Sequence, residues 1–139
     1  MPNPARILIL AHRTAATPPL IAAVRDRATH GSCEFTLVVP DSSGETEVED
    51  ARETLELAIP LLEDAAGGRV EGFIGQADAF AAAKAAHERQ PFDEAIISTL
   101  PTNVSRWLRL DLPARVRRLG LPVTVVTPRR ADREFFKLN

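Results

Sequence analysis

Two short polar segments hold the residues best suited to binding a ligand. Each one directly follows a run of apolar residues. Together they offer an imidazole, several hydroxyls, an amide and two guanidinium groups, and guanidinium groups make charge-assisted hydrogen bonds to phosphates and carboxylates. We therefore predict a site for a small anion. The candidate ligand-binding residues are His12, Arg13, Thr14, Ser98, Thr99, Thr102, Asn103, Ser105 and Arg106.

The same residue types also have a purely structural interpretation. Serine and threonine hydroxyls commonly bond to backbone groups of their own loops. Neither Ser98 nor Ser105 stands in a G-x-S-x-G motif, and no general base can be identified for either, so we expect no catalytic residue. Cys33 is the single cysteine and has the acidic Glu34 beside it, which would raise the pKa of its thiol. No HExxH pair is present, and we expect no metal site.

Length and composition favour a small globular protein. The chain has 139 residues, 45% of them hydrophobic and 26% charged, with a net charge of −2. We expect one domain over residues 1–139, with a basic tail from about residue 129. No apolar run approaches membrane-spanning length, and the first residues lack the apolar core of a signal peptide, so we expect a cytoplasmic protein without a membrane partner. The nearly balanced charge argues against a nucleic-acid partner.

Charge is distributed unevenly along the chain. Residues 41–64 contain nine acidic residues and one arginine, whereas residues 106–137 contain nine basic and three acidic residues. The basic third would suit an anionic ligand or partner. The alternative is that each block forms the solvated face of a helix.

The apolar runs alternate with helical patterns. We expect strands at residues 7–11, 34–39, 69–74, 94–98 and 121–127, and helices at 17–30, 46–66, 75–90 and 111–119. Pro60 lies inside the second helical pattern and predicts a kink or a break there. This alternation predicts an α/β protein with a single doubly wound, five-stranded parallel sheet and helices on both faces. In such sheets a ligand binds at the carboxyl ends of the strands, where the winding reverses.

Several segments in this order resemble the universal stress protein family. They are RILILA at residues 6–11, GFIGQADAFAAAKAA at 72–86, DEAIIST at 93–99 and ARVRRLGLPVTVV at 114–126. The resemblance covers the chain from Arg6 to Val126. It implies the strand order 3-2-1-4-5 and a homodimer formed through the last strand, Leu121–Thr127.

Many members of that family bind ATP through a glycine motif that begins where the fourth strand ends. The three glycines would fall on residues 97 or 98, 100 or 101, and 110 or 111, and none of these is glycine here. Pro101 has no N–H to donate, and Asp111 would bring a negative charge toward a phosphate. The family's usual Asp after the first strand is replaced by His12-Arg13. These departures count against ATP or AMP as a cofactor, unless Arg13, Arg106 and Arg109 replace the missing backbone donors.

Two function classes follow. The first is a non-catalytic domain for stress response or regulation that binds a small anion or nucleotide weakly. The alternative is an enzyme that acts on a phosphate ester or an adenylate. Trp107 is expected to anchor in the core or to wall the crevice. The Phe135-Phe136 pair is expected to pack against its own domain or a second subunit, because an exposed pair would be a liability.

Overall fold

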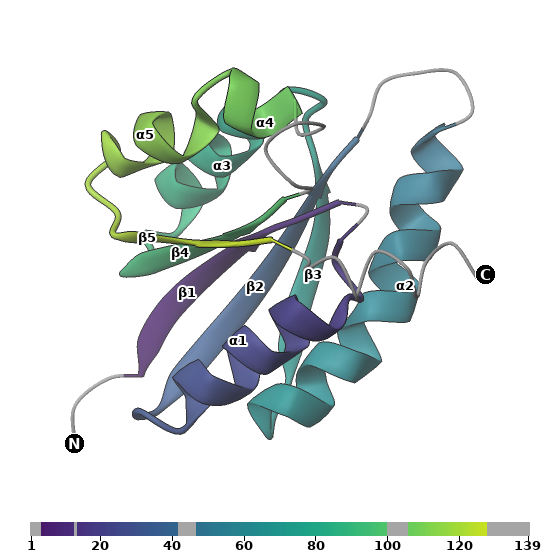
Figure 1. The fold of residues 1–139 in the computed structure, drawn as a ribbon, viewed down its shortest axis with the longest axis vertical. Coiled ribbons are helices and arrows are strands. Elements are labelled where there is room, and N and C mark those ends of the chain that lie inside the picture. Colours follow the sequence, from purple (N-terminus) through teal and green to yellow (C-terminus); the bar gives the residue numbers. More distant parts are fainter. Residues whose placement is uncertain (1–3, 13, 42–46, 100–105, 128–139) are drawn as a thin grey trace.

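Five parallel strands form one sheet with the order β3-β2-β1-β4-β5 (Figure 1). The computed structural model describes residues 4–12, 14–41, 47–99 and 106–127. The strands are β1 (Ala5–Leu10), β2 (Cys33–Pro40), β3 (Val70–Gly75), β4 (Glu94–Ser98) and β5 (Val123–Val126). The helices are α1 (Pro18–Ala28), α2 (Glu47–Ala66), α3 (Ala79–Arg89), α4 (Arg106–Arg109) and α5 (Leu112–Arg117). The predicted fold class and strand order are confirmed.

Helices cover both faces of the sheet. Figure 1 shows α1 and α2 side by side on one face and α3, α4 and α5 on the other. Each face has its own apolar cluster: Leu20 and Leu62 belong to the α1–α2 cluster, and Ala83 and Val116 belong to the α3–α5 cluster. Among the described residues, no helix is both long enough and apolar enough to cross a bilayer.

Strand β1 lies at the centre and explains the continuous apolar run in the sequence. Ile7 and Ile9 pack into the α1–α2 cluster, whereas Leu8 and Leu10 pack into the α3–α5 cluster. All four side chains are fully buried. A strand covered on both faces needs apolar residues at every position, which is why no alternation is visible in this segment.

Strand β3 comes very close to the helices that cover it. A Cβ added at Gly72 would lie 2.8 Å from Ile59 Cδ1 of α2, and one added at Gly75 would lie 2.7 Å from Ala82 Cβ of α3. The alanine-rich sequence of α3 allows such an approach, because its side chains are small. Glycine on the strand and alanine on the helix together set this short distance.

Three predicted features of the helices need correction. Of the two alternatives at Pro60, the break is wrong, because α2 runs without interruption from Glu47 to Ala66, and the kink stays a prediction. Pro60 is on the exposed side, where water can bond to the carbonyl that the missing N–H leaves open. Helix α3 begins at Ala79 rather than at Gly75, because the Asp78 side chain accepts a hydrogen bond from Ala81 N (2.9 Å) and caps the helix. The last predicted helix is shorter, and the separate helix α4 precedes it.

The contact between β3 and α3 gives a stability prediction. Gly75→Ala should lower the free energy of unfolding by about 1–3 kcal/mol, because the new methyl overlaps Ala82 and neither backbone can move freely. Gly68→Ala is the matched control, since a Cβ there meets nothing within 4 Å. Urea unfolding of both variants measures the difference. Equal midpoints for the two variants would contradict the close approach.

Candidate functional site

The winding of the sheet reverses between β1 and β4. β1 pairs with β2 on one side and with β4 on the other, and Leu10 near the carboxyl end of β1 is in register with Ile97 of β4. The loops that follow these two strands therefore leave the sheet at the same edge. This is where open parallel sheets bind ligands.

A buried hydroxyl pair connects the two loops. Thr14, after β1, and Ser98, at the end of β4, share a hydrogen bond of 2.6 Å between Oγ1 and Oγ. The two residues are 3% and 1% exposed, so water does not compete for this bond. Two of the predicted site residues, 84 positions apart in the sequence, are thus in direct contact.

Local turns hold the loop after β1 in place. The His12 carbonyl accepts a hydrogen bond from Ala15 N (3.1 Å), and the Thr14 carbonyl accepts one from the Thr17 hydroxyl (2.7 Å). Thr17 is the first residue of the helix predicted at residues 17–30, and a threonine side chain often caps a helix at this position. It occupies the N-cap position, but its hydroxyl bonds back to the loop instead of to a helix amide. Nothing in the sequence indicates which of these two nearby partners the Thr17 hydroxyl bonds to.

Strand β5 completes the edge on the other side of β4. Thr99 is 2% exposed, and its N–H donates to the Val126 carbonyl (2.9 Å). The described part of the candidate site therefore consists of His12, Thr14, Ser98 and Thr99. Arg13, Thr102, Asn103 and Ser105 lie outside the described residues, as does the side chain of Arg106. Their part in the anion site stays a prediction.

Positions of the glycine motif can be compared with the local structure. Ile97 is fully buried and fills the α3–α5 cluster where the first glycine could fall. Asp111, one of the two positions for the third glycine, has φ 58° and ψ 38°. This left-handed conformation is the one that glycine adopts most easily. Asp111 thus has a glycine-like backbone but carries an acidic side chain.

Trp107 packs against the α3–α5 cluster and is partly buried. The expectation that it anchors in the core is confirmed to that extent. A role as a wall of the crevice stays a prediction.

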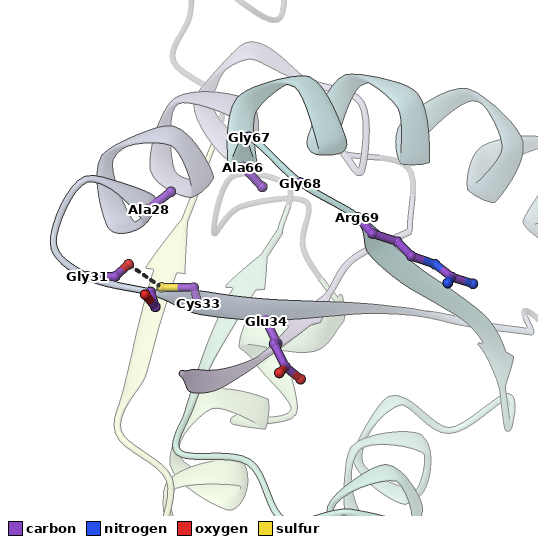
Figure 2. Close-up of a pocket in the computed structure, with 9 residues that line it drawn as sticks. Ala28, Gly31, Cys33, Glu34, Ala66, Gly67, Gly68 and Arg69 are labelled. Carbon is purple, nitrogen blue, oxygen red and sulfur yellow. Dashed lines mark hydrogen bonds between the residues drawn. The ribbon is translucent and has the colours of Figure 1, made fainter. Parts of the chain in front are cut away.

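A hollow lies at the opposite end of the strands. It has a volume of about 420 Å³ and is lined by the residues that follow α1 and α2, together with Cys33, Glu34 and Arg69 (Figure 2). The Arg69 and Glu34 side chains point away from Cys33 and do not converge on a common point. The hollow therefore lacks a cluster of polar groups that would hold a ligand.

The predicted cause of the Cys33 pKa shift needs correction. The pKa of the thiol is raised mainly by burial, and Glu94 raises it further, whereas Arg27 lowers it. The sequence neighbour Glu34 is not among the causes. Arg27 of α1 holds Glu94 of β4 in place through two hydrogen bonds of 2.9 and 3.0 Å. The acidic group that affects the thiol comes from a strand distant in sequence.

The sequence matches no protein-family model and no curated protein. Solved structures do resemble it. A universal stress protein from Archaeoglobus fulgidus has a TM-score of 0.63 at 16% identity, over 88% of this chain and 93% of its own. A complex of the Archaeoglobus fulgidus universal stress protein with dAMP has a TM-score of 0.59 at 14% identity, over 91% and 99% of the two chains.

A third structure, a universal stress protein in complex with cAMP, has a TM-score of 0.54 at 12% identity, again over 91% of this chain and 99% of its own. At these identities the likeness establishes the fold. The chain has the fold of the universal stress proteins over nearly its whole length.

The hydroxyl pair predicts a strong coupling between Thr14 and Ser98. Thr14→Val and Ser98→Ala should each lower the free energy of unfolding by about 1–3 kcal/mol, because each leaves a buried hydroxyl unpaired. The double variant should be no less stable than the worse single variant. Urea unfolding of the four proteins measures this coupling.

Thr29→Val supplies the control for this cycle. The Thr29 hydroxyl is exposed and bonds to the nearby Asp26 carbonyl (2.6 Å), so its effect should add to that of Ser98→Ala. Additive effects of Thr14→Val and Ser98→Ala would show that the two hydroxyls do not interact.

Proposed function

We propose that this chain is a single-domain, non-catalytic member of the universal stress protein family that acts in regulation or stress response. In this proposal it binds a small anion or nucleotide weakly at the carboxyl ends of β1 and β4. The proposal rests chiefly on the Thr14–Ser98 contact, which joins the two loops at the point where the winding reverses. Two solved structures with this fold are complexes of universal stress proteins, one with dAMP and one with cAMP. They support a nucleotide as the class of ligand.

The residues of the proposed site have different roles. The Thr14 and Ser98 hydroxyls are buried and bonded to each other, so they hold the loops rather than contact a ligand. Charge for an anion would come from Arg13 and Arg106, with His12 and Thr99 at the edge of the sheet. Side-chain cations would replace the backbone donors that the glycine motif supplies elsewhere.

A titration tests this assignment. ATP, AMP and cAMP should each be added to the protein at up to millimolar concentration in a calorimeter, and at least one should bind. Arg13→Ala or Arg106→Ala should weaken that binding by roughly tenfold or more, because each removes a charge-assisted hydrogen bond. Arg69→Ala is the matched control, since Arg69 lines the hollow at the other end of the strands.

The outcomes separate the two function classes. No heat from any of the three nucleotides would overturn the nucleotide proposal. Turnover of ATP or of a nitrophenyl phosphate ester that disappears in Arg106→Ala would favour the enzyme instead. Mass spectrometry of ligands released from the denatured protein would identify a nucleotide that co-purifies.

The dimer predicted from the last strand belongs to the same proposal. β5 is an edge strand, and its side that faces β4 is already bonded: the Pro122 carbonyl accepts a hydrogen bond from Ala95 N of β4, and the Val126 carbonyl accepts one from Thr99 N just after β4 (both 2.9 Å). Because strand residues alternate, the backbone groups of Val123 and Val125 face the open edge. A second copy pairing there would extend the sheet.

A proline at this edge tests the dimer. Val125→Pro removes an outward N–H without breaking a bond to β4, so it should convert a dimer to a monomer while the fold persists. Light scattering at high micromolar concentration gives the mass, and circular dichroism checks the fold. Ile74→Pro on the opposite edge strand is the control for a general effect of edge prolines. A monomeric starting protein would contradict the dimer.

A further inference from the structure

An apolar stripe on α2 faces solvent. Leu57 is 68% and Leu61 is 44% exposed. These are the two highest values among the large apolar side chains of the described helices. They are four residues apart and therefore adjacent on one side of the helix. Glu53 precedes them by one turn and Asp64 follows by one turn, and both are exposed. These four residues together form a stripe that is apolar in the middle and acidic at both ends.

The stripe borders α1. Asp64 is 3.9 Å from Arg25 of α1, which places this side of α2 next to that helix. Figure 1 shows α1 beside the C-terminal part of α2. Pro18 and Ala22 of α1, which lie on the same side of α1 as Arg25, are exposed too. Small and apolar groups therefore continue from α2 onto α1.

The last twelve residues, 128–139, have the complementary chemistry. They contain three large apolar residues close together, Phe135, Phe136 and Leu138. They also contain four basic residues against two acidic ones. Helix α2 has seven acidic residues and one arginine between Glu47 and Ala66. The basic segment 128–139 is therefore complementary in charge to the acidic helix α2, and both segments contain large apolar side chains.

The described part of the chain ends beside α1. β5 ends at Val126, which packs in the same apolar cluster as Ile21 of α1. From there, the eight residues up to Phe135 span up to about 26 Å when extended. Packed helices lie about 8–10 Å apart, so this length is sufficient to cross α1 and reach α2.

We propose that residues 128–139 dock across α1 onto α2, with the Phe135-Phe136 pair against Leu57 and Leu61 and the basic residues beside the acidic ends of the stripe. A second copy of the chain fits this face less well. A two-fold contact would place one acidic helix against another, and like charges in contact are unfavourable. This docking does not depend on a ligand at the carboxyl ends of β1 and β4.

Hydrogen exchange measured by mass spectrometry tests the docking. The full chain is compared with a chain that ends at Thr127 and with the full-length double variant Phe135→Ser/Phe136→Ser. Loss of docking should speed exchange in the second half of α2 by about tenfold, because a helix covered on one more side opens less often. Peptides from α3, on the other face of the sheet, should be unchanged.

A second pair of substitutions shows whether the leucines are the docking surface. Leu57→Ser/Leu61→Ser should give fast exchange in the full chain, and removing residues 128–139 from this variant should cause no further increase. Leu110→Ser is the matched control, since Leu110 is 53% exposed outside α2. In this control, truncation should still speed exchange in α2.

Three results would overturn the proposal. One is equal exchange in α2 for the full and the truncated chains. Another is a truncation effect that persists unchanged in Leu57→Ser/Leu61→Ser. The third is protection that rises with protein concentration and remains after truncation, which would assign the face to a second copy.

Discussion

The fold depends on burying β1 on both of its faces. Ile7, Leu8, Ile9 and Leu10 are fully enclosed, and each apolar cluster of the molecule takes two of them. A strand in this position needs a neighbour on each side and a helix layer above and below. β2 and β4 supply the neighbours, and their positions create the reversal of winding between β1 and β4. The location of the candidate site is therefore a consequence of how the core is built.

Much of the fold could be predicted from the sequence because its signals are local. Apolar runs of strand length alternate with helical patterns, and β4 was placed at its observed bounds, Glu94–Ser98. Pro60 misled the prediction because its cost depends on exposure, which only the packed helix reveals. The start of α3 was predicted too early because the sequence does not single out Asp78, three residues after the end of β3, as the cap of the helix. In both cases the local sequence is compatible with two structures, and tertiary packing decides which one forms.

The candidate site could be predicted from the sequence only in part. Topology brings the ends of β1 and β4 to one edge, so the proximity of the two polar segments could be expected. The hydrogen bond between Thr14 and Ser98 could not be expected, because nothing in the sequence indicates which partner a hydroxyl bonds to. Cys33 is a second example. The acidic group that raises the pKa of its thiol is Glu94, which Arg27 holds in place, and not the adjacent Glu34. Contacts between distant segments decide the chemistry of these groups.

The position of β4 also has a bearing on how the chain folds. β1, β2 and β3 are consecutive in sequence and adjacent in the sheet, so they can assemble with α1 and α2 once the first 75 residues are available. The other face then exposes Leu8, Leu10 and Val38 until α3 and α5 arrive. β4 must pair with the open side of β1, and the Arg27–Glu94 contact can form only at that stage. During synthesis on the ribosome, the half-built sheet would thus present one apolar face and one unpaired central strand, and both are covered only by residues that follow Gly75.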